Sequence, residues 1–203
     1  MSDDFWGLSD GEDASAGASG EFDAGGGNLE PIPAETSVLA AIDEAKWDKD
    51  QKGNRFISLR WTVFQPEEFG NRKVYQKLWV LDDEPKAKDP VKKRDKAKKM
   101  LAAIDTNAGG KLLAKPVMPT DEAMTLHLTN KPMVIKVMVW SMRDQMTGEL
   151  ARGNWVGAVA PKSSPISTPE EIERGKAEQA RAYANTAGQA AKANRTIDDS
   201  IPF

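Results

Sequence analysis

The 203-residue sequence predicts a mainly β domain with one or two helices, in which five strands form a small, partly open barrel. Three observations lead to this prediction. Several short segments alternate apolar and polar residues, which is the pattern of half-buried strands. These segments follow the order of three strands, a helix and two strands. The stretch before them is rich in Gly, Ser, Ala and Asp and holds too few apolar residues to order itself.

The first three strands are expected before residue 82. Residues 38–47 are expected to form the first, and 55–64 form the second, where apolar and polar residues alternate cleanly. A loop with Gly70-Asn71 as its turn signal leads to the third strand, residues 72–81. The core-facing residues of the second and third strands are expected to be Ile57, Leu59, Trp61, Val63, Val74, Gln76, Leu78 and Val80.

A helix is expected after the third strand. Asp89 suits the N-cap, Pro90 suits the first helical position, and Gly109-Gly110 marks the end. Apolar residues recur at helical spacing along its length, which predicts one buried face. These residues are Ala97, Met100, Leu101 and Ile104. Residues 121–128 add a short second helix.

The last two strands are expected at residues 131–142 and 154–159, joined by a hairpin through Thr147-Gly148. Together with the earlier elements, they suit an OB-fold-like, five-stranded barrel whose helix fills the gap after the third strand. An antiparallel sheet backed by one helix fits nearly as well.

Four regions are expected along the chain. A disordered acidic tail comes first, and the barrel domain follows it. Next comes a linker with a weakly packed helix, for which Thr168 and Glu171 form a capping box. A disordered acidic tip ends the sequence. The four regions are residues 1–34, 35–162, 163–197 and 198–203.

The charges are segregated along the chain. Residues 1–45 contain 11 acids and no Lys or Arg. Residues 46–162 contain 23 Lys and Arg against 14 Asp and Glu, a net charge of +9. Such a domain attracts a polyanion, because binding releases condensed counterions. An ordinary solvated surface is the alternative explanation of this charge.

Composition argues against several other classes of protein. Because the sequence has no Cys, neither a disulfide framework nor a thiolate metal site is expected. There is no apolar run long enough to span a membrane, and the acidic start does not suit a signal peptide. We therefore expect a cytoplasmic protein that does not act at a membrane.

Catalysis has little support in the sequence. His127 is the single histidine, and the leucines beside it favour a structural role. The acidic run Asp82-Asp83-Glu84 is a candidate Mg²⁺ site for a nuclease, although a turn after a strand commonly carries such acids. Gly109-Gly110-Lys111 lacks the first Gly and the Ser or Thr of a phosphate-binding loop. No enzyme activity, cofactor or metal is expected.

The polar faces of the predicted strands combine aromatic rings with cations. Single-stranded nucleic acid needs this combination, because bases stack on flat rings while Lys and Arg contact the phosphates between them. In the alternative interpretation, Trp79 and Trp140 are interior residues and the lysines coat an exposed sheet. The predicted single-stranded-DNA-binding residues are Phe56, Arg60, Phe64, Lys73, Tyr75, Lys77, Trp79, Lys136 and Trp140.

The end of the sequence has the composition of a ligand for another protein. Proline stiffens the backbone, Phe203 can fill a pocket, and the carboxylates suit a basic rim. The predicted partner-binding residues are Asp198, Asp199, Ile201, Pro202 and Phe203. This ending resembles the acidic tip of bacterial single-stranded-DNA-binding proteins, which implies recruitment of replication or repair proteins.

The barrel region contains short sequence patterns at residues 55–61, 71–73, 77–80, 100–104 and 130–132. In these patterns it resembles a family of phage-encoded proteins regarded as OB-type single-strand binders. The resemblance implies an accessory to phage DNA replication or recombination in a bacterial host, and it assigns no DNA-contacting residues. An adaptor or inhibitor whose tail imitates a host tip is the alternative, and self-association is left open.

Overall fold

Five antiparallel strands form one sheet in the order β3-β2-β1-β4-β5. The computed structural model describes residues 30–81, 89–143 and 150–198, and the sheet and helices belong to one compact unit, Pro31–Phe203. Along the chain, its elements are β1 (Thr36–Lys49), β2 (Arg55–Gln65), the 3-10 turn η1 (Glu67–Phe69), β3 (Lys73–Leu78), α1 (Pro90–Ala108), α2 (Asp121–Leu128), β4 (Met133–Arg143), β5 (Leu150–Ala160) and α3 (Pro169–Asp198).

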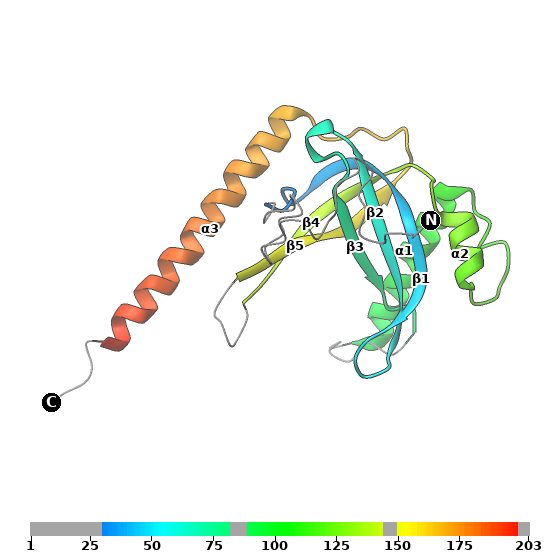
Figure 1. Cartoon of the computed structure of the whole chain (residues 1–203), viewed down its shortest axis with the longest axis horizontal. Helices are drawn as coiled ribbons and strands as arrows, with labels where there is room; N and C mark the ends of the chain where they lie inside the picture. The colour runs from blue at the N-terminus through cyan, green and yellow to red at the C-terminus, as the bar shows by residue number, and fades with distance from the viewer. Residues whose placement is uncertain (1–29, 82–88, 144–149, 199–203) are drawn as a thin grey trace, which may run out of the picture. The chain divides into compact units, whose positions relative to one another are not determined.

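The sheet coils into an OB-like, partly open barrel, which confirms the predicted fold class (Figure 1). The edge strands β3 and β5 approach each other, and the side-chain amide of Gln76 donates a 3.5 Å hydrogen bond to the carbonyl of Val156 across the gap. Helix α1 contacts both of these strands. The helix therefore covers the opening left by the unpaired edges, as predicted.

The barrel interior holds the apolar faces of the strands. Trp61 lies at its centre with no exposed surface, and its indole N–H donates a 3.1 Å hydrogen bond to the side-chain oxygen of Gln76. Because a buried N–H without a partner is costly, this bond explains a glutamine in the core. The other core residues of β2 and β3 are those predicted: Ile57, Leu59, Val63, Val74 and Leu78.

Helix α1 begins and ends where the sequence predicts. The Asp89 side chain accepts a 3.0 Å hydrogen bond from the backbone N–H of Lys92, and Pro90 occupies the first turn. Gly109 ends the helix at a φ of 117°, a left-handed conformation that favours glycine. Ile104 is fully buried, and the predicted inward face packs on the core through Ala97, Met100, Leu101 and Ile104.

Three register shifts interrupt the sheet and change the direction of nearby side chains; the first leaves Phe64 of β2 without a direct partner in β1. The shift in β1 occurs at Asp43, so that Asp43 and Glu44 both project from the side of the sheet opposite the core. The shift in β5 occurs at Gly157, so that Val156 and Val159 both face inward although they are three positions apart. Each is a β-bulge, a feature that re-aims neighbouring side chains.

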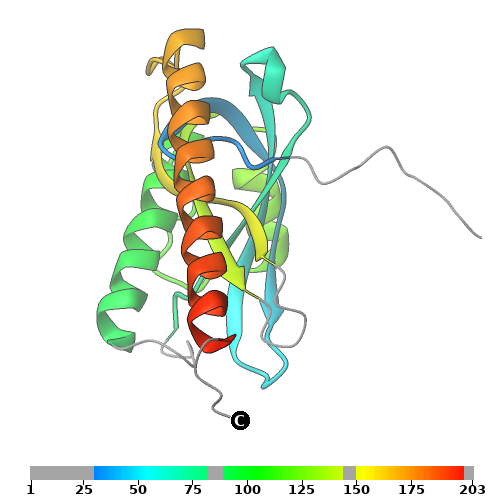
Figure 2. The ribbon, with the colours of Figure 1, turned by 90° about the vertical axis from the view of Figure 1, so that its left-hand side faces the viewer.

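Helix α3 begins with the predicted capping box, in which Thr168 and Glu171 exchange hydrogen bonds. Its first half packs on the barrel domain, unlike the weakly packed spacer that the sequence suggested (Figure 2). Ile172 is 2% exposed, and the side chain of Gln179 donates a 3.1 Å hydrogen bond to the carbonyl of Pro31. The alanine-rich pattern gave no sign of these nonlocal contacts.

Some bounds differ from the predicted ones, and some predicted features lie outside the described residues. Strand β3 ends at Leu78, so Trp79 follows the strand. Strands β4 and β5 extend further toward their connection than predicted, and the turn at Thr147-Gly148 is among the residues not described. So are the tail up to residue 29 and residues 199–203. None of the helices in the described part has the length and apolar character needed to cross a bilayer.

Candidate nucleic-acid interface

The predicted residues of β2 and β3 lie together on the outer side of the barrel. We call this surface the β2–β3 face, formed by Arg60, Phe64, Lys73, Tyr75 and Lys77. Arg60 lies opposite Tyr75 in the register, and the two lysines flank Tyr75 along β3. Tyr75 is 63% exposed and Phe64 is 47% exposed. Both rings are therefore accessible to a ligand.

Phe56 projects from the same side but is covered by its neighbours. Its side chain is only 2% exposed. The ring centroids of Phe56 and Trp79 lie 4.9 Å apart, and the Lys77 ammonium lies 4.7 Å from the Phe56 centroid. Trp79 is itself half-buried. Phe56 therefore supports Trp79 and Lys77 and presents little surface to a base.

Acidic side chains that were not among the predicted site residues neutralise part of the β2–β3 face. Asp43 accepts a 2.8 Å hydrogen bond from the Arg60 guanidinium and a 2.6 Å one from the Lys73 ammonium. It also accepts one of 2.8 Å from Thr62. Glu44 lies 2.8 Å from a second guanidinium nitrogen of Arg60. Two predicted phosphate-binding cations are thus already paired.

The pKa of Asp43 reflects this network. Burial alone would raise the pKa of the carboxyl group. Hydrogen bonds from Lys73, Thr62 and Arg60 outweigh burial and lower that pKa from 3.8 to about 2. Asp43 therefore keeps its negative charge throughout the neutral range and holds the two cations in place.

The other predicted residues lie on β4, which β1 separates from β2. Pairing between β1 and β4 ends at Thr36 and Val137, whereas β4 and β5 stay paired as far as Arg143 and Leu150. The hairpin therefore continues beyond β1 as a two-stranded extension. We call this extension, residues 138–143 and 150–155, the β4–β5 arm.

The outer face of the arm carries two indoles. Trp140 and Trp155 are each 41% exposed. Trp155 lies opposite Met138 in the register, two residues from Trp140 along β4, so the indoles are diagonal neighbours on one face. Trp155 was not predicted as a site residue. Regular alternation along β5 does not reveal that Trp155 faces outward, because the direction of its side chain depends on the register shift at Gly157.

The indole of Trp140 lies against a glycine of the neighbouring strand. A Cβ atom added to Gly153 would lie 2.7 Å from Cζ2 and 2.8 Å from Cε2 of that indole. Such distances are below van der Waals contact, so the ring rests on the bare backbone of β5. Gly153 therefore holds the indole close to the sheet while its other surface stays exposed.

The opposite face of the arm is held by segments from both ends of the domain. The Asn154 side chain accepts a 2.9 Å hydrogen bond from the N–H of Ile32 and donates a 2.8 Å one to its carbonyl. The Arg152 guanidinium lies 3.4 Å from the ring centroid of Tyr183 in α3. These contacts restrain the arm and fix the direction of its outer face.

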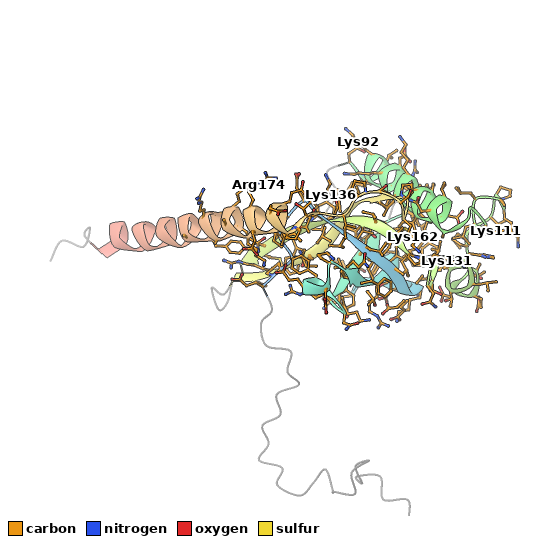
Figure 3. All side chains as sticks on the ribbon, turned by 90° about the horizontal axis from the view of Figure 1, so that it is seen from above. Lys92, Lys111, Lys131, Lys136, Lys162 and Arg174 are labelled. Atoms are coloured by element: carbon orange, nitrogen blue, oxygen red, sulfur yellow. The ribbon has the colours of Figure 1, made fainter. Side chains whose placement is uncertain are left out.

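A groove of about 970 Å³ lies beside the first residues of β1, next to β4 and the start of α3. Lys136 and Arg174 line it, and Figure 3 shows them near each other. Glu35, Glu171 and Glu178 line it as well. The groove thus has no excess of positive charge, although Lys136 belongs both to its lining and to the outer side of β4.

The remaining predictions concern catalysis and the tip. Within residues 30–81, 89–143 and 150–198, no group of three His, Cys, Asp or Glu is placed to hold a metal ion. The acidic run Asp82-Asp83-Glu84 lies outside the described residues. Helix α3 ends at Asp198, whose side chain is not described. The other residues of the predicted tip also lie outside the described part of the chain: Asp199, Ile201, Pro202 and Phe203.

Comparison with known proteins adds no assignment. No protein-family model matches the chain, and no curated protein matches it significantly. The candidate interface therefore rests on the residues and the fold alone.

Proposed function

We propose that the protein binds single-stranded DNA without sequence specificity and is not an enzyme. One observation carries the proposal: the outer side of an OB-like barrel exposes aromatic rings beside cations, while the core is complete without them. Tyr75, Trp140 and Trp155 are the most exposed of its tyrosine and tryptophan rings among the described residues. Rings in this position offer stacking surfaces, and Lys77 and Lys136 offer charge for the phosphates.

The exposed rings favour an unpaired strand over a duplex. In a duplex the flat faces of the bases are stacked on one another, so a ring on a protein surface has no access to them. In a single strand every base has a free face, and stacking on it tolerates any sequence. We therefore propose a role in phage DNA replication or recombination, in line with the family resemblance of the barrel region.

The acidic tip is proposed to recruit host or phage replication proteins. An Ile-Pro-Phe terminus behind two acids suits a pocket with a basic rim on the partner. A second candidate function is an adaptor or inhibitor that uses the same tip and binds protein through the sheet. The pairing of Arg60 and Lys73 with Asp43 favours this second candidate, because it removes charge that DNA would need.

Titration with a labelled oligo-dT strand, and with a duplex of equal length, tests the proposed function. We expect tighter binding of the single strand and an affinity that falls steeply with salt. Tryptophan emission should be quenched on binding, because exposed indoles stack on bases. Equal affinity for both DNAs, or no binding at low salt, would contradict the proposal and leave the adaptor function.

Removal of residues 198–203 separates the two roles. The truncated protein should lose binding to its replication partner and keep equal or higher DNA affinity, because an acidic segment competes with phosphates for the basic surface. A large loss of DNA affinity would contradict this division of roles. A chain with Ile201 and Phe203 changed to Ser is a matched control that keeps the acids.

A further inference from the structure

We infer that the single strand follows the outer side of β4 and β5 and stacks on Trp140 and Trp155, rather than crossing the β2–β3 face. The inference rests on the proposed function and specifies which surface of the protein the DNA strand contacts. It adds Trp155 as a base-stacking residue and assigns Gly153 and Asn154 supporting roles. Four features of the described structure support it: charge, ring spacing, the row of cations and the rigidity of the arm.

Direct ion pairing of the cations distinguishes the two surfaces. On the β2–β3 face, Arg60 and Lys73 are paired with Asp43 and Glu44 within 3 Å. A phosphate approaching these cations would have to compete with carboxylates that are already hydrogen-bonded to them. On β4, Lys136 is exposed, and no carboxylate of the described residues lies within ion-pair distance of it.

The spacing of the two indoles suits an extended single strand. Diagonal neighbours on an antiparallel pair lie about 7–8 Å apart. Consecutive bases in a duplex are separated by about 3.4 Å along each strand. Two bases that stack on Trp140 and Trp155 must therefore be pulled apart, as happens in a strand without a complement.

Cations continue the path along the same two strands. Lys136 lies on the same outer face of β4 as Met138 and Trp140, because residues two positions apart in a strand share a face. Lys131 precedes β4 and Lys162 follows β5, at the end of the ribbon away from the arm. Figure 3 shows Lys136, Lys162 and Lys131 in a row across the domain, all of them exposed. Phosphates of a strand whose bases reach the arm would meet these lysines in turn.

The arm is held rigid before DNA binds. Asn154 ties it to the backbone of Ile32 by two hydrogen bonds, and Arg152 packs on Tyr183 of α3. Gly153 lets the Trp140 indole lie directly against the backbone of β5. A stacking surface that is already ordered loses less conformational entropy on binding, which strengthens binding without any new contact.

The test compares single substitutions on the two surfaces by fluorescence anisotropy with labelled oligo-dT at several salt concentrations. Trp155→Ala should weaken binding about 5- to 150-fold, as expected for one stacked base, and Trp155→Phe should keep most of the affinity. Tyr75→Ala should have a smaller effect than Trp155→Ala. Leu126→Ala, which alters an exposed leucine of α2, is the control for nonspecific effects.

Salt dependence distinguishes stacking residues from phosphate contacts. Lys136→Ala should reduce the slope of log affinity against log salt by about 0.7, the value for one phosphate contact on a single strand. Trp155→Ala should leave that slope unchanged. Circular dichroism and thermal unfolding of each variant show whether the fold is intact. If the Trp155→Ala variant unfolds, the affinity of a folded Trp155→Phe variant for oligo-dT still tests the inference.

The outcomes separate this inference from the proposed function. If the wild-type protein binds oligo-dT and Tyr75→Ala weakens binding more than Trp155→Ala does, the path along β4 and β5 is wrong and the function stands. If the wild-type protein does not bind DNA, the function itself fails. If Trp155→Ala changes only the oligomeric state in sedimentation, the arm is a contact between copies of the chain, and the inference is overturned.

Discussion

The Nε of Arg60 donates a 2.8 Å hydrogen bond to Oδ1 of Asp43, a residue that the register of β1 leaves without a direct partner in β2. The same carboxylate binds the Lys73 ammonium through its other oxygen. A β-bulge thus places one acid between two cations on the outer side of the barrel. This arrangement decides the charge of the β2–β3 face and the acid stability of the strands that form it.

Asp43→Asn should lower stability at neutral pH. The pKa of Asp43 falls from 3.8 to about 2 on folding, so its stabilising effect is complete above pH 3.8 and disappears as the pH falls toward 2. Because the carboxylate is partly exposed, we expect a loss of about 1–2 kcal/mol in the free energy of unfolding.

Urea unfolding at pH 7 and at pH 2.5 measures this effect. The difference between wild type and Asp43→Asn should be large at pH 7 and small at pH 2.5. Asp48→Asn, which changes an exposed acid of the same strand, is the matched control. A difference that does not depend on pH would contradict the assigned role of the Asp43 carboxylate.

Gln76→Leu should destabilise the barrel even though leucine is the more apolar residue. The substitution leaves the buried N–H of Trp61 without its acceptor and removes the hydrogen bond from β3 to the Val156 carbonyl. An unsatisfied buried donor costs about 1–3 kcal/mol. Urea unfolding at pH 7 measures the loss, and Gln65→Leu at the exposed end of β2 is the control. A stabilised Gln76→Leu protein would show that the indole finds another acceptor.

The strands and α1 could be predicted because their signals are local. Alternation identified β2 and β3, and Asp89, Pro90 and Gly109 marked the ends of α1. The register shifts could not be predicted in this way. An extra residue such as Asp43 has no local signature, because it depends on how the neighbouring strand pairs. A glycine such as Gly157 suggests a bulge but does not fix the register of the strands around it.

The candidate site shows the same limit. Single-strand alternation placed Tyr75 and Lys77 on the outer side, as the structure has them. It could not show that Trp79 leaves the strand and covers Phe56, or that Asp43 neutralises neighbouring cations. Both depend on contacts between segments far apart in the sequence. The side of the sheet on which a residue lies was therefore easier to predict than whether its side chain is available to bind a ligand.

Gly153→Ala should displace the Trp140 indole. The new methyl group would lie 2.7 Å from the ring, and the rigid indole has to move as a whole. We expect a shift in tryptophan emission, a small loss of stability and weaker oligo-dT binding. In Gly157→Ala the methyl group meets Cγ of Met138 at 2.6 Å, and this flexible side chain turns away more easily. A larger change in emission for Gly157→Ala would contradict the assigned contact.

Tyr183→Ala should release the first half of α3 from the barrel domain. The Arg152 guanidinium lies 3.4 Å from the Tyr183 ring centroid, and such cation–π contacts contribute about 0.5–2 kcal/mol. Ile172 would still anchor the first turn, so loss of protection should begin after it. Hydrogen exchange measures the effect on amides of α3 and of the β4–β5 arm, with Arg181→Ala as an exposed control.

The two regions are expected to respond together in that experiment. Arg152 belongs to the arm and Tyr183 to α3, so losing their contact should raise amide exchange in both, whereas Arg181→Ala should change neither. Faster exchange in α3 alone would mean that the two hydrogen bonds between Asn154 and Ile32 are sufficient to hold the arm. In that case Asn154→Ala, not Tyr183→Ala, should loosen the surface that presents Trp155.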